Sequence, residues 1–371
     1  MDQATATATP AAAAPGGTAD PEERRARSRL TRDLLLLGIV GVLLAAAIWA
    51  GFSSLYRLFW GPSAFVERYI GMIADGDAAA ALAVPGVALD DTDLEAAGLP
   101  LTSSDALLRS AALTFELTDV AVTEKPVGDD EIEVTATYAI DGVAGKTTFH
   151  VTQVGSDGLT PRWGFATSPL AEIRATVLGS MQFSVNGFEM DKRQVSPDRE
   201  KADPVAPVSL LVFSPGIYSV EVDTATAETE PVKVLADTAL KSVPLEVQAE
   251  PTKAFTQVVK EKVSAFLAEC STQQVLQPSG CPFGIQIDDR VFADTIAWSI
   301  PSEPNVEIVP DGAYWAISPA TGTAHIEADV RSIFNGLIYH YSEDVPFVID
   351  GTVDILSDGT ASILVGSPAL R

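Results

Sequence analysis

Hydrophobic residues form one continuous block near the start of this chain and alternate with polar residues elsewhere. No charged residue occurs between positions 34 and 56. As a helix, residues 34–55 would be about 33 Å long at about 1.5 Å per residue, enough to cross the hydrocarbon core of a bilayer. Tyr56 and Trp60 suit the aromatic belt at a membrane surface. The pattern predicts a transmembrane helix over residues 34–58.

The charges beside this block predict its orientation. Five arginines precede it closely, whereas only Arg57 follows it closely. Because positively charged flanks stay in the cytoplasm, we expect residues 1–33 inside and the bulk of the chain outside the cell membrane, crossed once. The alternative is a cleaved signal peptide, since Ala45-Ala46-Ala47 fits a cleavage pattern. That triplet lies in the middle of the block, however, and the arm before it is long.

The first residues predict no fold. Residues 1–21 are mostly Ala, Thr, Pro and Gly, which bury too little apolar surface to offset the entropy of ordering. We therefore expect a disordered cytoplasmic tail over residues 1–33. Within the apolar block, Gly41 and Ala45 have a spacing that suits helix dimers but is also common filler, so the oligomeric state stays open.

Beyond the block, a helical period gives way to a period of two. Apolar positions from Phe65 to Ile73 have helical spacing, Gly76 is expected to end that helix, and Asp77 to cap a second one. A third helix is expected at 104–113. Four strands follow at 115–123, 131–140, 146–154 and 162–166, joined in part by Asp-Gly turns. Helices followed by an antiparallel meander predict an α+β domain over residues 62–175.

The remaining sequence predicts two further modules. Residues 180–250 show no helix pattern, and Asn186-Gly187 is a hairpin signal, so we expect a small all-β domain. From Pro251-Thr252 onward, an apolar helical stripe runs to Cys270. Strands are expected after it at 293–300, 306–309, 313–317, 323–328, 337–341 and 347–350, with a final hairpin turned by Asp358-Gly359. This order predicts a C-terminal α+β domain over residues 252–371.

Two of these modules resemble known families. The stretch FVERYIGMIADGDAAAALAV resembles the opening helices of the nuclear-transport-factor-two-like superfamily, which implies a cone-shaped α+β fold for residues 62–175. The C-terminal module repeats this order of helix before sheet and implies a second cone-like domain. The hairpin signal and the segment SPGIYSVEV resemble PEGA-like β domains. The overall plan is similar to single-pass bacterial envelope proteins of the teicoplanin-resistance-associated type, without their zinc ribbon, since no cysteine precedes the apolar block.

Charge excludes several kinds of partner. The chain has 24 basic and 50 acidic residues, a net charge of −26, and residues 62–371 alone carry −27. A sequence-independent nucleic-acid binder needs a cationic face, so nucleic acid is excluded as a partner. The densest acidic stretch, from Asp90 to Glu95, lacks the glycine and distal glutamate of a calcium loop and is interpreted as a solvated loop.

Little in the sequence points to catalysis, a cofactor or a metal. Cys270 and Cys281 lie on the expected outer side, where disulfides persist, and we predict that they form one. The isolated His150 is expected to be structural. The segment from His340 to Asp344 is interpreted as a strand end running into a turn. Residues 140–149 lack the first glycine of a phosphate-binding loop, and no nucleophile motif is present.

Two hypotheses about function follow. In the first, the protein is a membrane-anchored, extracytoplasmic binding or scaffold protein of the bacterial cell envelope, whose partner is an envelope protein or a wall polymer. In the second, it is a hydrolase or isomerase that uses a cavity inside a cone-like domain. The lack of a recognisable set of nucleophile, base and orienting acid favours a protein that is not an enzyme.

Overall fold

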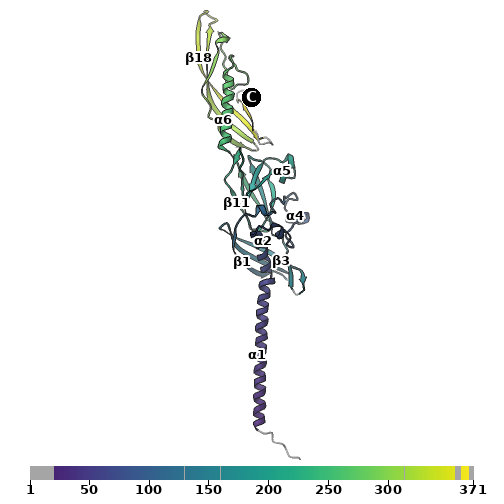
Figure 1. Ribbon diagram of the computed structural model, residues 1–371. Coiled ribbons are helices and arrows are strands. Elements are labelled where there is room, and N and C mark those ends of the chain that lie inside the picture. The colour runs from purple at the N-terminus through teal and green to yellow at the C-terminus, as the bar shows by residue number, and fades with distance from the viewer. Residues whose placement is uncertain (1–20, 129, 159, 313, 356–360, 367–371) are drawn as a thin grey trace, which may run out of the picture. The chain divides into compact units, whose positions relative to one another are not determined.

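The structure is a computed structural model that describes residues 21–128, 130–158, 160–312, 314–355 and 361–366. It is a mixed α+β protein with strands predominating (Figure 1). The chain divides into an N-terminal unit, Met1–Gly61, and a C-terminal unit, Pro62–Arg371. The expected hairpin turn at Asp358-Gly359 lies outside the described residues.

The N-terminal unit contains one long helix, α1 (Pro21–Trp60). Its stretch Arg32–Gly51 has a mean hydropathy of 2.5 and is 0% buried, so this helix is long and apolar enough to cross a membrane. Helix α1 begins earlier than expected. Residues 21–33, predicted as part of a disordered tail, are helical because Pro21 suits a first turn and the following Glu, Arg and Ala residues favour helix. Residues 1–20 lie outside the described part of the chain.

The C-terminal unit opens as the sequence predicted, with helices before a sheet. Helix α2 (Pro62–Ala74) ends before Gly76, which has a positive φ of 70°. The Asp77 carboxylate caps α3 (Ala78–Leu82) by accepting from Ala80 N at 3.1 Å. Helix α4 (Asp91–Ala97) falls in the acidic stretch expected to be a loop, and Asp90 and Asp93 form its capping box. The sheet is an antiparallel meander of β1 (Leu117–Pro126), β2 (Glu131–Ile140), β3 (Val143–Asp157) and β4 (Thr160–Phe165).

The helix expected at 104–113 was a wrong prediction. This segment forms turns and the short 3-10 helix η1 (Ser110–Ala112). Ser104 N donates to Ser209 O at 2.8 Å, and Leu211 N donates to Ser104 O at 2.9 Å, which makes a bridge to the neighbouring strand. That pairing holds Ser104 in an extended conformation, so tertiary contacts override the local helix preference.

The next strands form two sheets and a short pair. Strand β5 (Leu170–Leu178) lies between β12 (Ser242–Gln248), which is parallel to it, and β8 (Val208–Phe213), which is antiparallel. A domain boundary at 175 would therefore cut β5. The second sheet has the order β11-β9-β6-β7, and β10 pairs with β13. The bounds are β6 (Gln182–Val185), β7 (Phe188–Asp191), β9 (Gly216–Glu221), β10 (Ala227–Glu228), β11 (Val232–Ala236) and β13 (Glu250–Pro251), with the short helices α5 (Lys192–Val195) and η2 (Arg199–Lys201).

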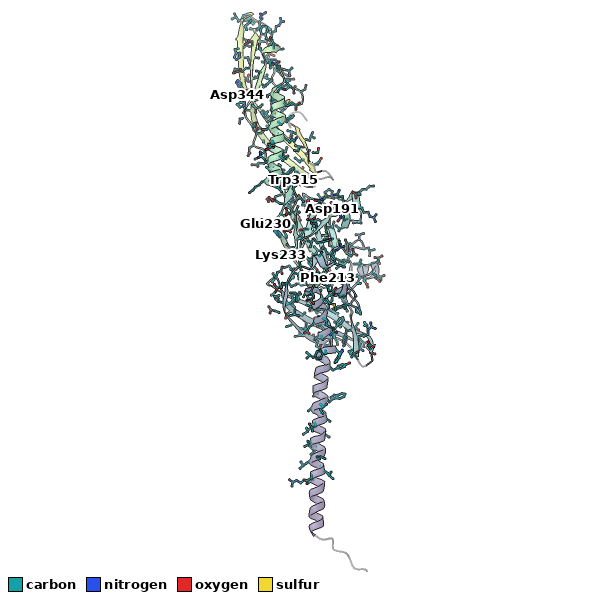
Figure 2. All side chains as sticks on the ribbon, in the orientation of Figure 1. Asp191, Phe213, Glu230, Lys233, Trp315 and Asp344 are labelled. Carbon is teal, nitrogen blue, oxygen red and sulfur yellow. A yellow bond between two sulfur atoms is a disulfide. The ribbon has the colours of Figure 1, made fainter. Side chains whose placement is uncertain are left out.

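Asn186-Gly187 turns the β6–β7 hairpin as the sequence predicted. Both residues have positive φ, 51° and 79°, as a tight two-residue turn requires. Trp315, labelled in Figure 2, is buried against Gly179, where an added Cβ would lie 3.0 Å from the indole ring. The end of β5 at Gly179 and the segment that carries Trp315 therefore pack directly together within the C-terminal unit.

The last sheet is dominated by two long strands, β17 (Tyr314–Arg331) and β18 (Ile338–Ile355). The sequence predicted two short strands in place of each. Strand β17 continues past Pro319 because the register with β18 shifts between Ile317 and Ala320, which absorbs the proline as a bulge. Three strands pair with β17: β14 (Arg290–Val291), β15 (Ala297–Ser302) and β16 (Ile308–Asp311). The short helix η3 (Ala293–Thr295) precedes β15. Strand β19 (Ala361–Gly366) pairs with β18.

Helix α6 (Lys253–Ser271) runs beside this sheet (Figure 1). Thr252 caps it by accepting from Phe255 N at 3.1 Å. Its buried stripe, which includes Phe255, Val259, Val263 and Leu267, belongs to the same core as Ile326 and Ala328 of β17. Because successive side chains of a strand point to opposite faces, the outward face of the long hairpin carries polar residues.

Candidate functional site

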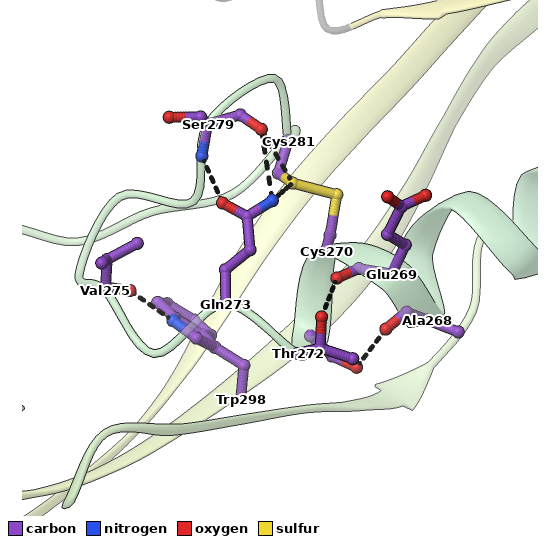
Figure 3. The surroundings of a disulfide bond; sticks show 10 residues. Ala268, Glu269, Cys270, Thr272, Gln273, Val275, Ser279, Cys281 and Trp298 are labelled. Carbon is purple, nitrogen blue, oxygen red and sulfur yellow. Dashed lines mark hydrogen bonds between the residues drawn. A yellow bond between two sulfur atoms is a disulfide. The ribbon is translucent and has the colours of Figure 1, made fainter. Parts of the chain in front are cut away.

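The two cysteines are joined by a disulfide, as the sequence predicted (Figure 3). Their Cα atoms lie 5.8 Å apart, and the bond ties the end of α6 to the loop that follows it. The Gln273 side chain braces this loop by accepting from Ser279 N at 2.8 Å, and Trp298 Nε1 donates to Val275 O at 2.8 Å. Both cysteines are buried, so this pair is a structural crosslink and not a reactive thiol.

His150 lies on β3 and pairs across the sheet with an acid. Its Nδ1 lies 2.6 Å from Glu131 Oε1, with both side chains partly exposed. The opposite face of this sheet is covered by α2 and filled with aromatic rings. Phe165 contacts Tyr69 and Phe65 at ring-centroid distances of 4.9 Å and 5.0 Å. Histidine therefore takes no part in the interior of this sheet.

The C-terminal hairpin brings together residues that the sequence analysis left apart. His325 on β17 lies directly opposite Asp344 on β18, in the middle of both strands. His325 Nδ1 lies 2.6 Å from Asp344 Oδ1, and Ser342 Oγ lies 3.2 Å from His325 Nε2. The segment interpreted as a strand end thus lies inside β18, and its Ser342 and Asp344 both contact the His325 ring from the neighbouring strand. A second pair, His340 and Asp329 at 3.1 Å, lies on the same face.

This arrangement has the connectivity of a nucleophile, a base and an orienting acid. The imidazole could accept the Ser342 proton while Asp344 holds its tautomer. Other features of the site oppose catalysis. Asp344 is 71% exposed, and Glu327 Oε1 also approaches His325 Nε2, at 3.8 Å. The backbone groups between β17 and β18 are engaged in strand pairing, so donors for an oxyanion must come from elsewhere.

The outer edge of β18 offers such groups. Within the described residues, β18 pairs on its second side only from Asp350 to Ile355, with β19. Residues 338–349 therefore present an open strand edge beside Ser342. An open edge can bind an extended chain by adding it as a further strand.

An acidic groove lies at β6, β7 and the end of β9, with a volume of about 470 Å³. Glu189, Asp191, Glu221 and Asp223 line it. Burial alone would raise the pKa of Asp191, but hydrogen bonds from the Arg193 side chain and backbone outweigh burial and lower it. Across the residues that the structure describes, no group of three or more His, Cys, Asp or Glu side chains could hold a metal ion.

Among the described residues of the C-terminal unit, the tip of the β17–β18 hairpin, residues 332–339, is the most exposed apolar feature. Phe334 is 95% exposed, Ile333 75% and Leu337 65%. The sequence analysis did not single out this segment, although the run IFNGLIY between two long strands carries the signal. Exposed apolar clusters of this kind mark contact surfaces.

Comparison with protein-family models, with curated proteins and with solved structures finds no match to this chain.

Proposed function

We propose that the protein is a single-pass membrane protein whose C-terminal unit lies outside the cytoplasm and acts as a binding or scaffold element of the bacterial cell envelope. The stretch Arg32–Gly51 of α1, with its high hydropathy and no buried residue, is the observation that carries the proposal. Such a helix in water would expose a continuous apolar surface, whereas in a bilayer that surface is solvated. Residues 1–33 then lie in the cytoplasm, in keeping with their arginines.

Two properties of the C-terminal unit support an extracytoplasmic position. It contains a buried disulfide between Cys270 and Cys281, and such bonds persist in oxidising compartments. Its net charge of −27 favours solubility and limits self-association outside the membrane.

A binding role is supported over catalysis in a cone interior by the packing beneath α2. Val66, Ile70 and Ile73 fill that interior together with Phe149 and Phe165. We propose that residues 62–175 and 252–371 are cone-like domains and residues 180–250 a PEGA-like domain. The order of α2 and α3 before β1–β4, and of α6 before the last sheet, supports this plan. The partner would be an envelope protein or a wall polymer.

Protease treatment of intact cells tests the proposal. With a tag at each end, external protease should remove the C-terminal tag and leave a protected fragment that carries the N-terminal tag. Permeabilised cells serve as the control, since both tags should then be lost. Protection of the C-terminal tag in intact cells would overturn the topology.

A second candidate function, ester or amide hydrolysis, is favoured by the contact of Ser342 with His325 and Asp344. The open edge of β18 could hold an extended substrate beside Ser342. The full chain should then react with a fluorophosphonate probe, and Ser342→Ala should abolish labelling. Ser299→Ala, opposite His325 on β15, is the matched control. Absence of Ser342-dependent labelling would remove this candidate and leave the binding role intact.

A further inference from the structure

The tip of the β17–β18 hairpin combines two properties. Its apolar side chains are exposed to solvent, and four of its backbone N–H groups donate to acceptors within the tip. Ser332 N donates to Leu337 O at 2.9 Å, and Gly336 N donates to Ser332 O at 3.0 Å. Phe334 N donates to Ser332 Oγ at 3.3 Å, and Leu337 N donates to Asn335 Oδ1 at 3.0 Å. The tip therefore presents hydrocarbon to its surroundings with few backbone donors that need water.

Polar groups mark where this apolar tip ends. Asp289 accepts from Ile333 N through Oδ1 and from the Tyr339 hydroxyl through Oδ2, both at 2.9 Å. Arg331 stacks on Phe292 at 5.5 Å, and Arg290 lies opposite Arg331 in the strand pairing. A tyrosine with a bound hydroxyl and two arginines, set just behind exposed Phe, Ile and Leu side chains, match the order of groups at a membrane interface.

We propose that this tip inserts into the acyl region of a phospholipid bilayer. A segment that enters hydrocarbon must satisfy its own backbone groups, and the tip does so for the donors named above. A few apolar side chains alone bind a bilayer weakly. The inference therefore rests on the proposed function, because anchoring by α1 raises the local concentration of lipid around the tip.

The charge of the C-terminal unit predicts which class of lipid the tip prefers. Asp289 and Asp329 lie directly behind the tip and limit the depth of insertion to residues 333–338. Arg290 and Arg331 balance these two charges, so it is the strongly acidic C-terminal unit as a whole that opposes anionic lipid. Insertion should therefore be stronger with zwitterionic phosphatidylcholine than with phosphatidylglycerol, and it should be insensitive to added salt in the zwitterionic case.

A fluorescence experiment on the full chain tests this inference. Because both native cysteines are in the disulfide, Phe334→Cys introduces one free thiol for an environment-sensitive dye. Val143→Cys, at the start of β3, gives a matched exposed control at 45% exposure. The labelled chains are reconstituted in phosphatidylcholine vesicles with and without spin-labelled lipid, and are also floated with these vesicles.

We expect blue-shifted emission and lipid quenching at position 334 but not at position 143. Ile333→Ser with Leu337→Ser should lower the inserted fraction by about tenfold or more, given the apolar area removed. Near-ultraviolet circular dichroism checks that the variant is folded. If the chain floats but position 334 stays unquenched, the inference is overturned while the anchor stands.

Two further outcomes are informative. Flotation that depends on the tip alone would overturn the anchor and support insertion. Energy transfer between labelled copies without lipid quenching would show a second copy on the tip and would overturn the lipid proposal.

Discussion

Glu172 is a buried acid near the start of β5, opposite Leu211 on β8. It is 1% exposed, and its Oε1 has no hydrogen-bond partner in the structure. A buried polar atom without a partner loses its hydration and gains nothing in return. Leu211, together with Leu94 and Leu99, forms a small apolar cluster on this side of the sheet.

Replacing Glu172 by leucine should therefore stabilise the fold. We expect Glu172→Leu to raise the free energy of unfolding by about 1–3 kcal/mol, measured by urea denaturation. Glu246→Leu, on the exposed side of β12, is the control and should change stability by less than about 0.5 kcal/mol. A clear loss of stability in Glu172→Leu would show that the carboxylate has a favourable role.

Lys192 is fully buried, and its ammonium group donates to the backbone oxygens of Val177 at 2.5 Å and of Pro204. Burial lowers the pKa of Lys192 from 10.5 to about 8, partly opposed by the charge of Asp203. Between these two values the unfolded chain holds a proton that the folded chain has released, so stability rises with pH across this window.

The comparison with Lys192→Met should show this dependence. From pH 8 to 10.5 the free energy of unfolding of the wild type should rise relative to the variant, by about 1.4 kcal/mol for each unit of pKa difference. Below pH 8 the difference should be constant. Lys201→Met, at an exposed position, should show no such slope. A flat difference for Lys192→Met would show that the buried amine keeps its ordinary pKa.

Residues that meet across the sheet could not be paired from the sequence. His325 and Asp344 are brought together by the register of β17 and β18. That register depends on the bulge near Pro319 and on the apolar residues that face α6. Local patterns record which residues alternate, but not which partner each one meets.

At the scale of elements, the sequence predicted those whose signals are local. Asp77 at the start of α3 and Asn186-Gly187 in the β6–β7 turn act through neighbouring backbone, and both behave as expected. The segment at 104–113 fails because Ser104 pairs with a strand that lies far along the chain. Residues 21–33 fail for the opposite reason, since a tail with good helix formers extends a helix that has already begun.

The disulfide between Cys270 and Cys281 is predicted to stabilise the fold. The two cysteines are separated by 11 residues, and closing such a loop restricts the unfolded chain. The double variant Cys270→Ser with Cys281→Ser should lose about 3 kcal/mol of stability, measured by thermal and urea unfolding. Reduction of the wild type should give the same loss, whereas Ser271→Ala with Ser279→Ala should leave stability nearly unchanged. Equal stability with and without the bond would contradict a structural role.

At the scale of the whole molecule, the two units have different roles: the first provides the apolar helix and the second the folded sheets. The N-terminal unit provides a helix with the length and hydropathy of a membrane span. The C-terminal unit carries the folded sheets, the disulfide and nearly all of the acidic charge. Hydropathy and charge are properties of composition, so the apolar helix and the acidic C-terminal unit could both be predicted from the sequence alone. The apolar run IFNGLIY is visible in the sequence, but its exposure at a hairpin tip follows from the pairing of β17 with β18 and could not be predicted.

The most direct test of this division is thiol accessibility in intact cells. A single cysteine is introduced at Ser28 or at Val143, and cells are treated with a membrane-impermeant maleimide while the native pair stays in its disulfide. The account predicts labelling of Val143→Cys in intact cells, and labelling of Ser28→Cys only after the membrane is permeabilised. Labelling of Ser28→Cys in intact cells, with Val143→Cys protected, would contradict it.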